Sequence, residues 1–528
     1  YSPERRAFFG DLHVHTALSL DARMQDTRTL PVDAYRYARG ETIGIPPYGD
    51  EGQALVSATI SRPLDFAAVT DHAEMLGESH ICHTPGMEGY NSYQCIALRW
   101  LPHYAGLFFN YKASSGERLG FCGDDGAICL EGSRAPWKQI QAAASSANND
   151  SGDCDFTSFV AYEWTGAGYL DSGLVANLHR NIVFRNDTVP ELPISFVESK
   201  NAHTLYRQLD EQCRGDCDVV VIPHNSNIDV GQMFAEIEPD GTPLTAESAA
   251  YKARYETLIE MIQHKGASEC YYGPNPIMEQ DELCDFEQLP WNSFAGNTFE
   301  SRAQPIQPDA GHARRVLHRG LVQGEALGVN PFHWGFIGST DTHRSLAGGV
   351  EEYGYQGHGG AGNAAVEAEA QGLPDEWEFN PGGLAVLYAE ENTRDSLFAA
   401  IKRREAYATS GPRIQVRMYA GEEIDGEMCE ANDFAAQGYQ QGVPMGAEID
   451  SPLQGMRIAV NAQKDPGTAT HPGTDLQRVQ IIKGWLDADG QMHERIYDVA
   501  VSDGREIASD GRARQPVGST VDISTATY

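Results

Sequence analysis

Near its N-terminus the chain has a short apolar run that ends in Gly10-Asp-Leu-His-Val-His-Thr-Ala-Leu-Ser-Leu-Asp21. The run, from Phe8 to His15, predicts a β-strand, in which successive side chains alternate between two faces. His13 and His15 therefore point the same way, as two imidazoles must in order to bind one metal ion or two adjacent ions. Asp21 follows in the loop as a further oxygen ligand. A single H-x-H pair also arises by chance, so its meaning depends on the rest of the chain.

Five further apolar runs carry residues of metal-ligand type at or beside their ends. One run ends in Asp71-His72, another contains the lone carboxylate Glu163, and a third ends in Asp341-Thr-His343. A charge inside an apolar run is costly unless it is paired or binds a cation. An isolated histidine is usually a core or surface residue, but recurrence at six strand ends argues against coincidence and predicts a multinuclear site for two or three divalent ions. The nine predicted ligands are His13, His15, Asp21, His72, Glu163, His179, His224, Asp341 and His343.

The apolar runs alternate with helix-like stretches through the first 400 residues. The runs cover 8–15, 64–70, 156–164, 181–184, 219–223, 258–263, 336–340 and 384–389, and the helix-like stretches include 31–39, 202–212, 313–327 and 393–404. This order is typical of a parallel α/β sheet. We predict that the sheet closes into a barrel with its catalytic groups at the C-terminal ends of the strands.

Composition changes along the chain predict its organisation. We expect a barrel over residues 1–410, interrupted by two long loops at about 80–153 and 266–308, which are rich in Gly, Ser, Asn and Pro and carry cysteine pairs. From residue 411 to 528, apolar and polar residues alternate between turn signals, which predicts antiparallel strands in a β-sandwich-like segment.

The charge balance narrows the class of partner. The 528 residues include 75 Asp and Glu against 39 Lys and Arg, a net charge of −36. Such an excess argues against nucleic acids and anionic membranes as partners. A small phosphate-bearing substrate remains compatible with it, because metal ions make a pocket locally positive. No apolar window approaches the roughly 18 residues of a membrane span.

Ten cysteines predict disulfides and therefore an oxidising compartment, so we expect a periplasmic or secreted protein. The sharpest local pair is Cys213 with Cys217, across a Gly-Asp turn. Other local pairs are Cys82 with Cys95, Cys122 with Cys129 and Cys270 with Cys284, although other connectivities remain open. The start at Tyr1 fits a mature exported form or a trimmed chain. The alternative is a cytosolic enzyme with scattered buried thiols; a zinc ribbon is disfavoured because no C-x2-C pair occurs.

The order of these motifs resembles that of the PHP (polymerase and histidinol phosphatase) superfamily. The series is H-x-H with a following Asp, then Asp-His, a lone Glu, two separate His and finally Asp-x-His. The closest likeness is to its exported branch, catalogued as domain of unknown function 3604. That branch's pattern also resembles Glu163-Trp-Thr-Gly, Ile262-Gln-His-Lys265-Gly-Ala-Ser-Glu269-Cys, Gly338-Ser-Thr-Asp-Thr-His-Arg344 and Ala406-Tyr-Ala-Thr-Ser-Gly-Pro-Arg413. The resemblance covers roughly residues 7 to 415.

The resemblance implies a distorted seven-stranded (β/α)7 barrel and a trinuclear site of Mn, Zn or Fe ions that hydrolyses phosphate esters. All nine ligand positions find a suitable residue, with Asp21 standing where some members have His. The cysteine-bearing insertions and the C-terminal β segment depart from the family pattern, so the resemblance does not carry over substrate choice. The metal identity and the oligomeric state also stay open.

The expected mechanism is attack on phosphorus by a metal-bridging hydroxide. We expect His13, His15, Glu163 and Asp341 to hold one ion, His72, Glu163, His179 and His224 a second, and Asp21 with His343 a third. Arg344 is the first candidate for a bidentate clamp on phosphate oxygens, with a surface salt bridge as its alternative. Lys265 and His264 are expected to bind the anion or to protonate the leaving group. Arg413 and Arg180 are weaker candidates for substrate binding, because a strand-end Arg often only pairs with a neighbouring carboxylate.

The favoured function is therefore a metal-dependent phosphomonoesterase acting on small organic phosphate esters. The same site would also serve a sulfatase or a phosphodiesterase. An alternative of a different class is a non-catalytic extracellular protein that captures a metal or an anion.

Overall fold

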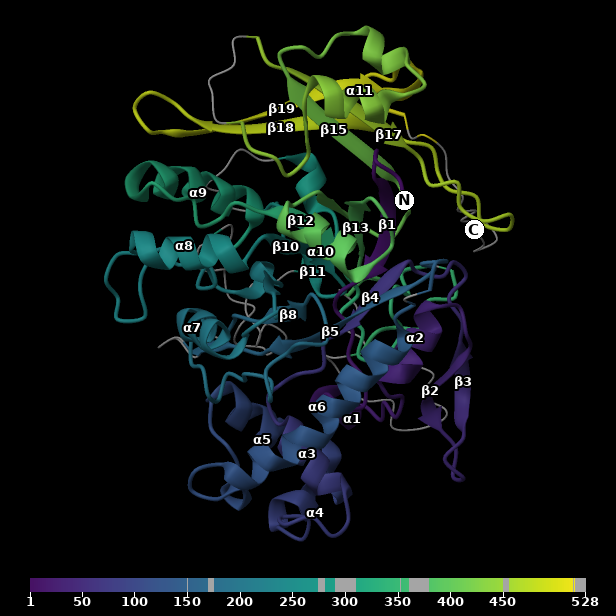
Figure 1. Ribbon diagram of the computed structural model, residues 1–528. Helices are drawn as coiled ribbons and strands as arrows, with labels where there is room; N and C mark the ends of the chain where they lie inside the picture. Colours follow the sequence, from purple (N-terminus) through teal and green to yellow (C-terminus); the bar gives the residue numbers. More distant parts are fainter. Residues whose placement is uncertain are drawn as a thin grey trace.

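The apolar run that precedes His13 and His15 forms strand β1 (Arg6–Asp11), which lies inside a curled seven-stranded sheet of order β14-β13-β1-β4-β5-β8-β9 (Figure 1). The structure is a computed structural model that describes residues 1–149, 151–169, 175–273, 281–289, 310–351, 353–359, 379–449, 455–515 and 517. The other strands of this sheet are β4 (Phe66–Val69), β5 (Thr157–Trp164), β8 (Arg180–Phe184), β9 (Val219–Pro223), β13 (Leu384–Ala389) and β14 (Ala406–Thr409).

Strand directions in this sheet are mixed. β1, β4 and β5 are parallel, whereas β8 runs antiparallel to both of its neighbours, and so does β13. The expectation of an all-parallel sheet is therefore wrong. Between β5 and β8 the chain forms a hairpin, β6 (Ala167–Tyr169) with β7 (Val175–Asn177), and antiparallel neighbours need no crossover helix.

A second sheet faces the opening of the curled one. Its strands are β11 (Gly266–Ala267), β10 (Leu258–Gln263) and β12 (Gly335–Gly338), with β10 and β12 parallel. β10 lies beside β9, and β12 lies beside β13 and β14. In the described part of the chain no ladder of backbone hydrogen bonds joins the two sheets. The curled sheet is therefore a half-barrel with the three-stranded sheet beside it, and the closed (β/α)7 barrel remains a prediction.

The period of two along the strands divides the core into an inner and an outer layer. Phe8 belongs to the cluster enclosed by both sheets, which also contains Leu258 of β10 and Ile337 of β12. Phe9, its neighbour, belongs to the cluster between the curled sheet and the helices outside it. Gly10 allows β1 and β4 to approach closely, because a Cβ there would overlap the ring of Phe66.

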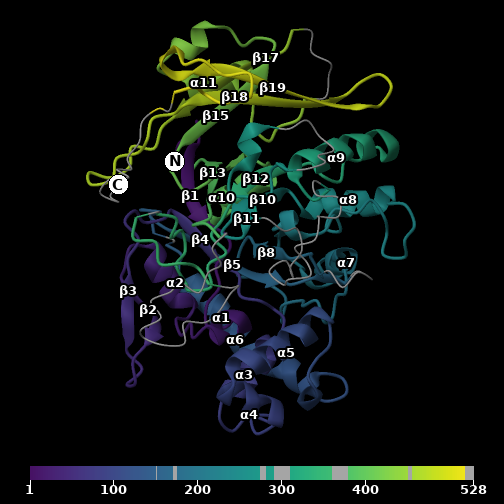
Figure 2. The same ribbon diagram turned by 180° about the vertical axis from the view of Figure 1, so that it is seen from behind.

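Helices surround the sheets (Figures 1 and 2). They are α1 (Leu20–Met24), α2 (Pro31–Ala38), α7 (Ala202–Gln212), α8 (Ala246–Tyr255), α9 (Ala313–Leu327) and α10 (Arg394–Lys402), and the hairpin β2 (Ile43–Tyr48) with β3 (Ala54–Ala58) flanks α2. None of the described helices is both long and apolar enough to cross a membrane.

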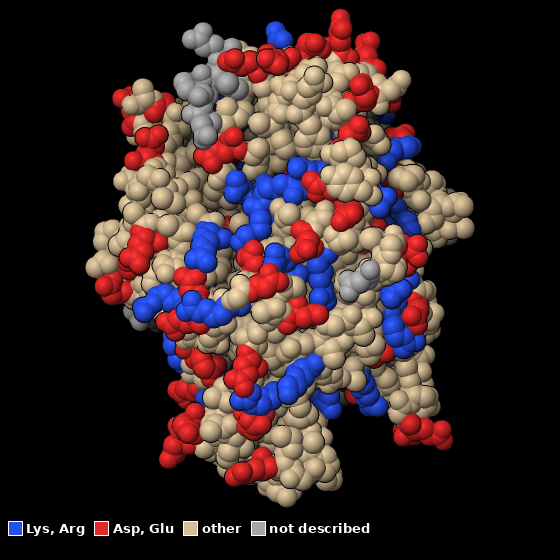
Figure 3. Space-filling view, viewed as in Figure 1, with Lys and Arg blue, Asp and Glu red and all other residues tan. Residues whose placement is uncertain are grey.

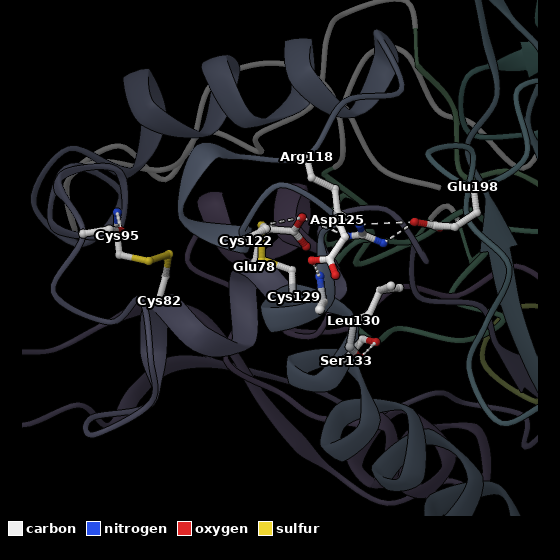
Figure 4. The surroundings of a disulfide bond; sticks show 12 residues. Glu78, Cys82, Cys95, Arg118, Cys122, Asp125, Cys129, Leu130, Ser133 and Glu198 are labelled. Carbon is white, nitrogen blue, oxygen red and sulfur yellow. Dashed lines mark hydrogen bonds and ion pairs between the residues drawn. A yellow bond between two sulfur atoms is a disulfide. The ribbon is translucent and has the colours of Figure 1, made fainter.

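The first insertion is helical, whereas the sequence predicts long loops. It contains α3 (Leu76–His83), α4 (Tyr93–Trp100), α5 (Pro102–Ser114) and α6 (Ala127–Ala147). These helices have a core of their own around Leu98 and Phe109, joined by the disulfides Cys82–Cys95 and Cys122–Cys129 (Figure 4). The Gly and Ser residues between the apolar positions hid this periodicity.

The remaining predicted cysteine pairs are also confirmed, as Cys213–Cys217 and Cys270–Cys284, while Cys154 and Cys429 are unbonded. Of the second insertion, 274–280 and 290–309 lie outside the described residues.

Beyond residue 410 the expected antiparallel strands are present. They are β15 (Gln415–Gly421), β16 (Val443–Pro444) and β17 (Arg457–Gln463) in one sheet and β18 (Arg478–Leu486) with β19 (Met492–Val501) in another, with helix α11 (Phe434–Gln441) beside β15.

Candidate metal centre

The nine predicted ligands meet at one edge of the fold, where β1, β4, β5, β9 and β12 end and the antiparallel β8 begins. Isolated β-bridges pair His72, which follows β4, with Glu163 of β5, and pair Val14, which follows β1, with Thr342, which follows β12. The amide of Asp341 also donates a hydrogen bond to the carbonyl of His13 at 3.0 Å. Parallel strand ends deliver side chains to a common edge. The structure therefore brings together residues that are up to 330 positions apart in the chain.

Glu163 lies at the centre of the cluster and is only 1% exposed. Its Oε2 lies 3.3 Å from His13 Nε2, 3.1 Å from His15 Nε2 and 3.3 Å from His72 Nδ1. Its Oε1 lies 2.7 Å from His179 Nδ1 and 3.1 Å from His224 Nε2. One buried carboxylate is thus shared by five imidazoles, an arrangement that suits a bridge between cations.

Asp341 forms a second node. Its Oδ1 lies 3.2 Å from Nε2 of both His13 and His15 and 3.5 Å from His343 Nδ1. Its backbone has a φ of 56°, in the left-handed region that non-glycine residues rarely adopt. Such a conformation persists only where the surrounding contacts fix it.

Asp21 forms the third node, on the outer side of the cluster. It stands in the first turn of α1, and its Oδ2 lies 3.0 Å from Nε2 of both His72 and His343. With a side chain about one-fifth exposed, Asp21 faces the solvent side, whereas Glu163 and Asp341 are enclosed.

These atoms fit divalent cations. Groups of three potential ligand atoms within 4.8 Å of one another include His13, His15 and Asp341, then Glu163, His179 and His224, and also His15, His72 and His343. His15 Nε2 is buried beside two carboxylate oxygens, yet neither contact has hydrogen-bond geometry. A buried imidazole nitrogen that faces two carboxylates in this way is placed as a metal ligand would be.

Electrostatics hold the pKa of Glu163 low, whereas the imidazoles around it divide between raised and lowered pKa values. Burial by itself would raise the pKa of Glu163, but the imidazoles of His72, His224 and His179 outweigh it and hold that pKa well below its usual range. Burial lowers the pKa of His224 to about 3, with His13 adding to the effect. Ionised carboxylates and a neutral imidazole are the forms that bind cations.

Several buried residues that support the ligands were not among the predicted site residues. Glu260 Oε2 lies 3.1 Å from His13 Nδ1, which leaves Nε2 for the cluster. Asp71 accepts hydrogen bonds from Thr16 and Ser19, and Ser19 Oγ lies 2.9 Å from His15 Nδ1. Such partners orient metal-binding imidazoles. Glu260 carried a visible signal, a lone carboxylate in an apolar run, which is the same signal that identified Glu163.

Two of the predicted substrate-binding residues lie in the cluster and one lies beside it. Lys265 Nζ is paired with Asp341 Oδ2, and His264 Nε2 lies 3.7 Å from the same oxygen. Gln263, which sequence reasoning missed, donates to that oxygen at 2.6 Å. Arg344 follows His343 directly and donates to the carbonyl of Gln356 at 2.6 Å.

Two other predicted substrate-binding residues have different surroundings. The Arg180 guanidinium is buried against Glu256, with Nε 2.8 Å from Oε1, so a neighbouring carboxylate already satisfies it. Arg413 donates to the carbonyls of Arg62 and Pro63 and lines a separate cavity of about 600 Å³, among whose described lining residues there is no predicted metal ligand.

Comparisons with known proteins complete the description. The chain is similar to a two-domain protein from Bacteroides vulgatus ATCC 8482 that contains a predicted PHP-like metal-dependent phosphoesterase, with 10% identity and a TM-score of 0.29 over 80% of this chain and 81% of the other. That score is too low to support a conclusion about fold or activity. The comparison with curated proteins found no match. A family model described as "Protein of unknown function (DUF3604)" matches residues 2–528. The chain therefore belongs to the DUF3604 family.

Proposed function

We propose that this protein is a metal-dependent hydrolase that releases phosphate from small organic phosphate esters. The observation that carries the proposal is the single buried carboxylate of Glu163 shared by five imidazoles, with Asp341 and Asp21 beside it. The motif order that resembles the PHP superfamily supports the same reaction class. The proposed compartment is extracellular or periplasmic, with which four disulfides are compatible.

The proposed ligand sets follow the short distances between imidazole nitrogens and carboxylate oxygens in the cluster. His13, His15, Glu163 and Asp341 would hold one ion, His72, Glu163, His179 and His224 a second, and Asp21 with His343 a third. Divalent cations in such a site supply Lewis acidity and make a water nucleophilic near neutral pH. The resemblance to the PHP superfamily implies Mn, Zn or Fe, and each of these accepts mixed imidazole and carboxylate ligands.

The chain's own cations would position the phosphate. Lys265 adds a positive charge directly beside Asp341, so it is the proposed group for a phosphoryl oxygen. Burial and the neighbouring Lys265 hold the pKa of His264 well below its usual range, so its imidazole is neutral. We therefore assign His264 to hydrogen bonding and Lys265 to charge. Arg344, at the edge, would clamp the outer phosphate oxygens.

The test is turnover by the purified chain after loading with Mn, Zn or Fe. We expect phosphate release from an aryl phosphate, with a higher KM in Lys265→Met. Lys252→Met serves as a matched control, because Lys252 lies on α8 over the ring of Phe332, outside the cluster. Parallel assays with an aryl sulfate and a phosphodiester separate the two alternative hydrolases. Absence of turnover with all substrates and metals, in a protein that still binds metal, would favour the non-catalytic binding protein.

A further inference from the structure

The helical hairpin α4–α5 lies at one end of the molecule, opposite to the sheets of the C-terminal segment (Figures 1 and 2). It carries several exposed aromatic side chains. Trp100 is 79% exposed and Tyr104 is 73% exposed. The name aromatic tip is used here for six of the exposed apolar side chains, Tyr93, Ile96, Trp100, Tyr104, Phe108 and Tyr111, beside which Leu101 and Leu107 are also exposed. The spacing of 3, 4 and 7 residues places three of them on one face of each helix.

The opposite face of the hairpin is also apolar. Leu98, Phe109 and Ala113 are buried in the core of the helical insertion, and Gly106 packs against Met24 of α1. α5 is therefore apolar nearly all round, although the described part of the chain covers only one of its faces. A helix of this kind normally has both faces removed from water.

The tip is uncharged in a strongly acidic protein. Residues 89–116 contain no Asp or Glu, although the chain has 75 acidic residues in 528. Both cationic side chains of this segment are engaged: Arg99 donates to the carbonyls of Cys82 and Tyr90, and Lys112 pairs with Glu117. Figure 3 shows the lower end, around α4, mostly in the tan of uncharged residues.

A second copy of the chain fits this surface poorly. The longer helix has 13 residues, so the hairpin face measures roughly 20 Å by 20 Å, or roughly 400 Å², about half of what each partner buries in a stable complex. Each copy would also bring a net charge of −36. A lipid surface needs no matching shape, and Trp and Tyr favour its headgroup region because they combine an apolar ring with a polar edge.

We propose that the aromatic tip inserts into the headgroup region of an uncharged, zwitterionic lipid surface, so that the protein lies on a membrane without spanning it. The neutral tip gains from burial of its rings, whereas the acidic remainder of the molecule opposes approach to an anionic surface. Helix α1 carries Asp21 and packs on α5, so it connects the hairpin that carries the tip to the metal centre.

Vesicle flotation with the full chain tests the proposal. We expect the protein to float with phosphatidylcholine vesicles, and the double variant Trp100→Ser/Phe108→Ser to bind at least roughly tenfold more weakly for each ring removed. Leu55→Ser is the matched control, because Leu55 is 49% exposed on β3 and lies outside the tip. It should bind like the wild type, and thermal unfolding should show that all variants are folded.

Varying the charge of the vesicles provides an independent test. Vesicles containing phosphatidylserine should bind more weakly than phosphatidylcholine alone at low salt, and the difference should vanish near 1 M salt, where the screening length is roughly 3 Å. The proposal is overturned if the wild type fails to float, if the double variant floats equally well, or if anionic vesicles bind more tightly. A wild-type dimer that the double variant converts to a monomer, without vesicle binding, would also overturn it and assign the tip to a contact between copies.

Discussion

Replacing Arg180 by Met should destabilise the protein strongly without a specific effect on substrate binding. Arg180 is 2% exposed and Glu256 is fully buried, and they form an ion pair of 2.8 Å. The same guanidinium donates to the Leu178 carbonyl at 2.6 Å, and the Tyr206 hydroxyl donates to Glu256. Met fills a similar volume, but it leaves the buried carboxylate of Glu256 with the Tyr206 hydroxyl as its remaining side-chain partner. Breaking a buried pair costs roughly 3–5 kcal/mol.

Urea unfolding, monitored by tryptophan fluorescence with metal and without it, measures this loss. The double variant Arg180→Met/Glu256→Gln should recover part of it, because the uncompensated charge is gone, so the coupling should exceed about 1 kcal/mol. The KM for an aryl phosphate should change less than threefold at a temperature where both proteins are folded. A large rise in KM with an unchanged free energy of unfolding would refute the structural role and return Arg180 to the substrate site.

Three further predictions concern pH, packing and metal content. Burial raises the pKa of Asp229 to about 7 from 3.8, so its contribution to folding is full below pH 4 and is lost as pH rises through 7. Between pH 5 and pH 8 this loss is roughly 3 kcal/mol, and unfolding measured at these two pH values should show that Asp229→Asn escapes it. Gly311→Ala should cost about 1–3 kcal/mol, because its Cβ would overlap the Ser226 carbonyl oxygen, and an unchanged melting temperature would contradict the packing. Glu163→Gln should lower metal content by at least one ion per chain in elemental analysis, whereas the surface change Glu198→Gln should leave it unaltered.

The candidate site was more predictable than the sheet around it. Ligand types are rare in apolar runs, so Glu163 and the D-x-H motif at Asp341 are visible without any knowledge of topology. Strand direction depends on contacts between distant segments. β8 pairs antiparallel with β5, with Asn181 opposite Glu163, and its residues would look the same in a parallel strand.

Supporting residues were harder to predict than ligands. The sequence indicates a ligand-type pair at Asp71-His72, but the Asp71 carboxylate faces Thr16 and Ser19 while His72 faces the cluster. Adjacent strand residues point to opposite faces, so one of the two had to turn away. Which one does so depends on the register with β1, and the sequence contains no local signal for that register.

The acidity of the chain and its metal chemistry are linked through protons. In the cluster the pKa of His72 is raised to about 10, because Asp21 and Glu163 outweigh its burial, while the pKa of His224 is lowered to about 3. Near neutral pH a proton is therefore held on His72, on one side of Glu163, and is excluded from His224 on the other side. Divalent cations would replace that proton, so metal affinity should rise with pH. A net charge of −36 raises the local concentration of such cations, and this benefit should weaken as salt screens it.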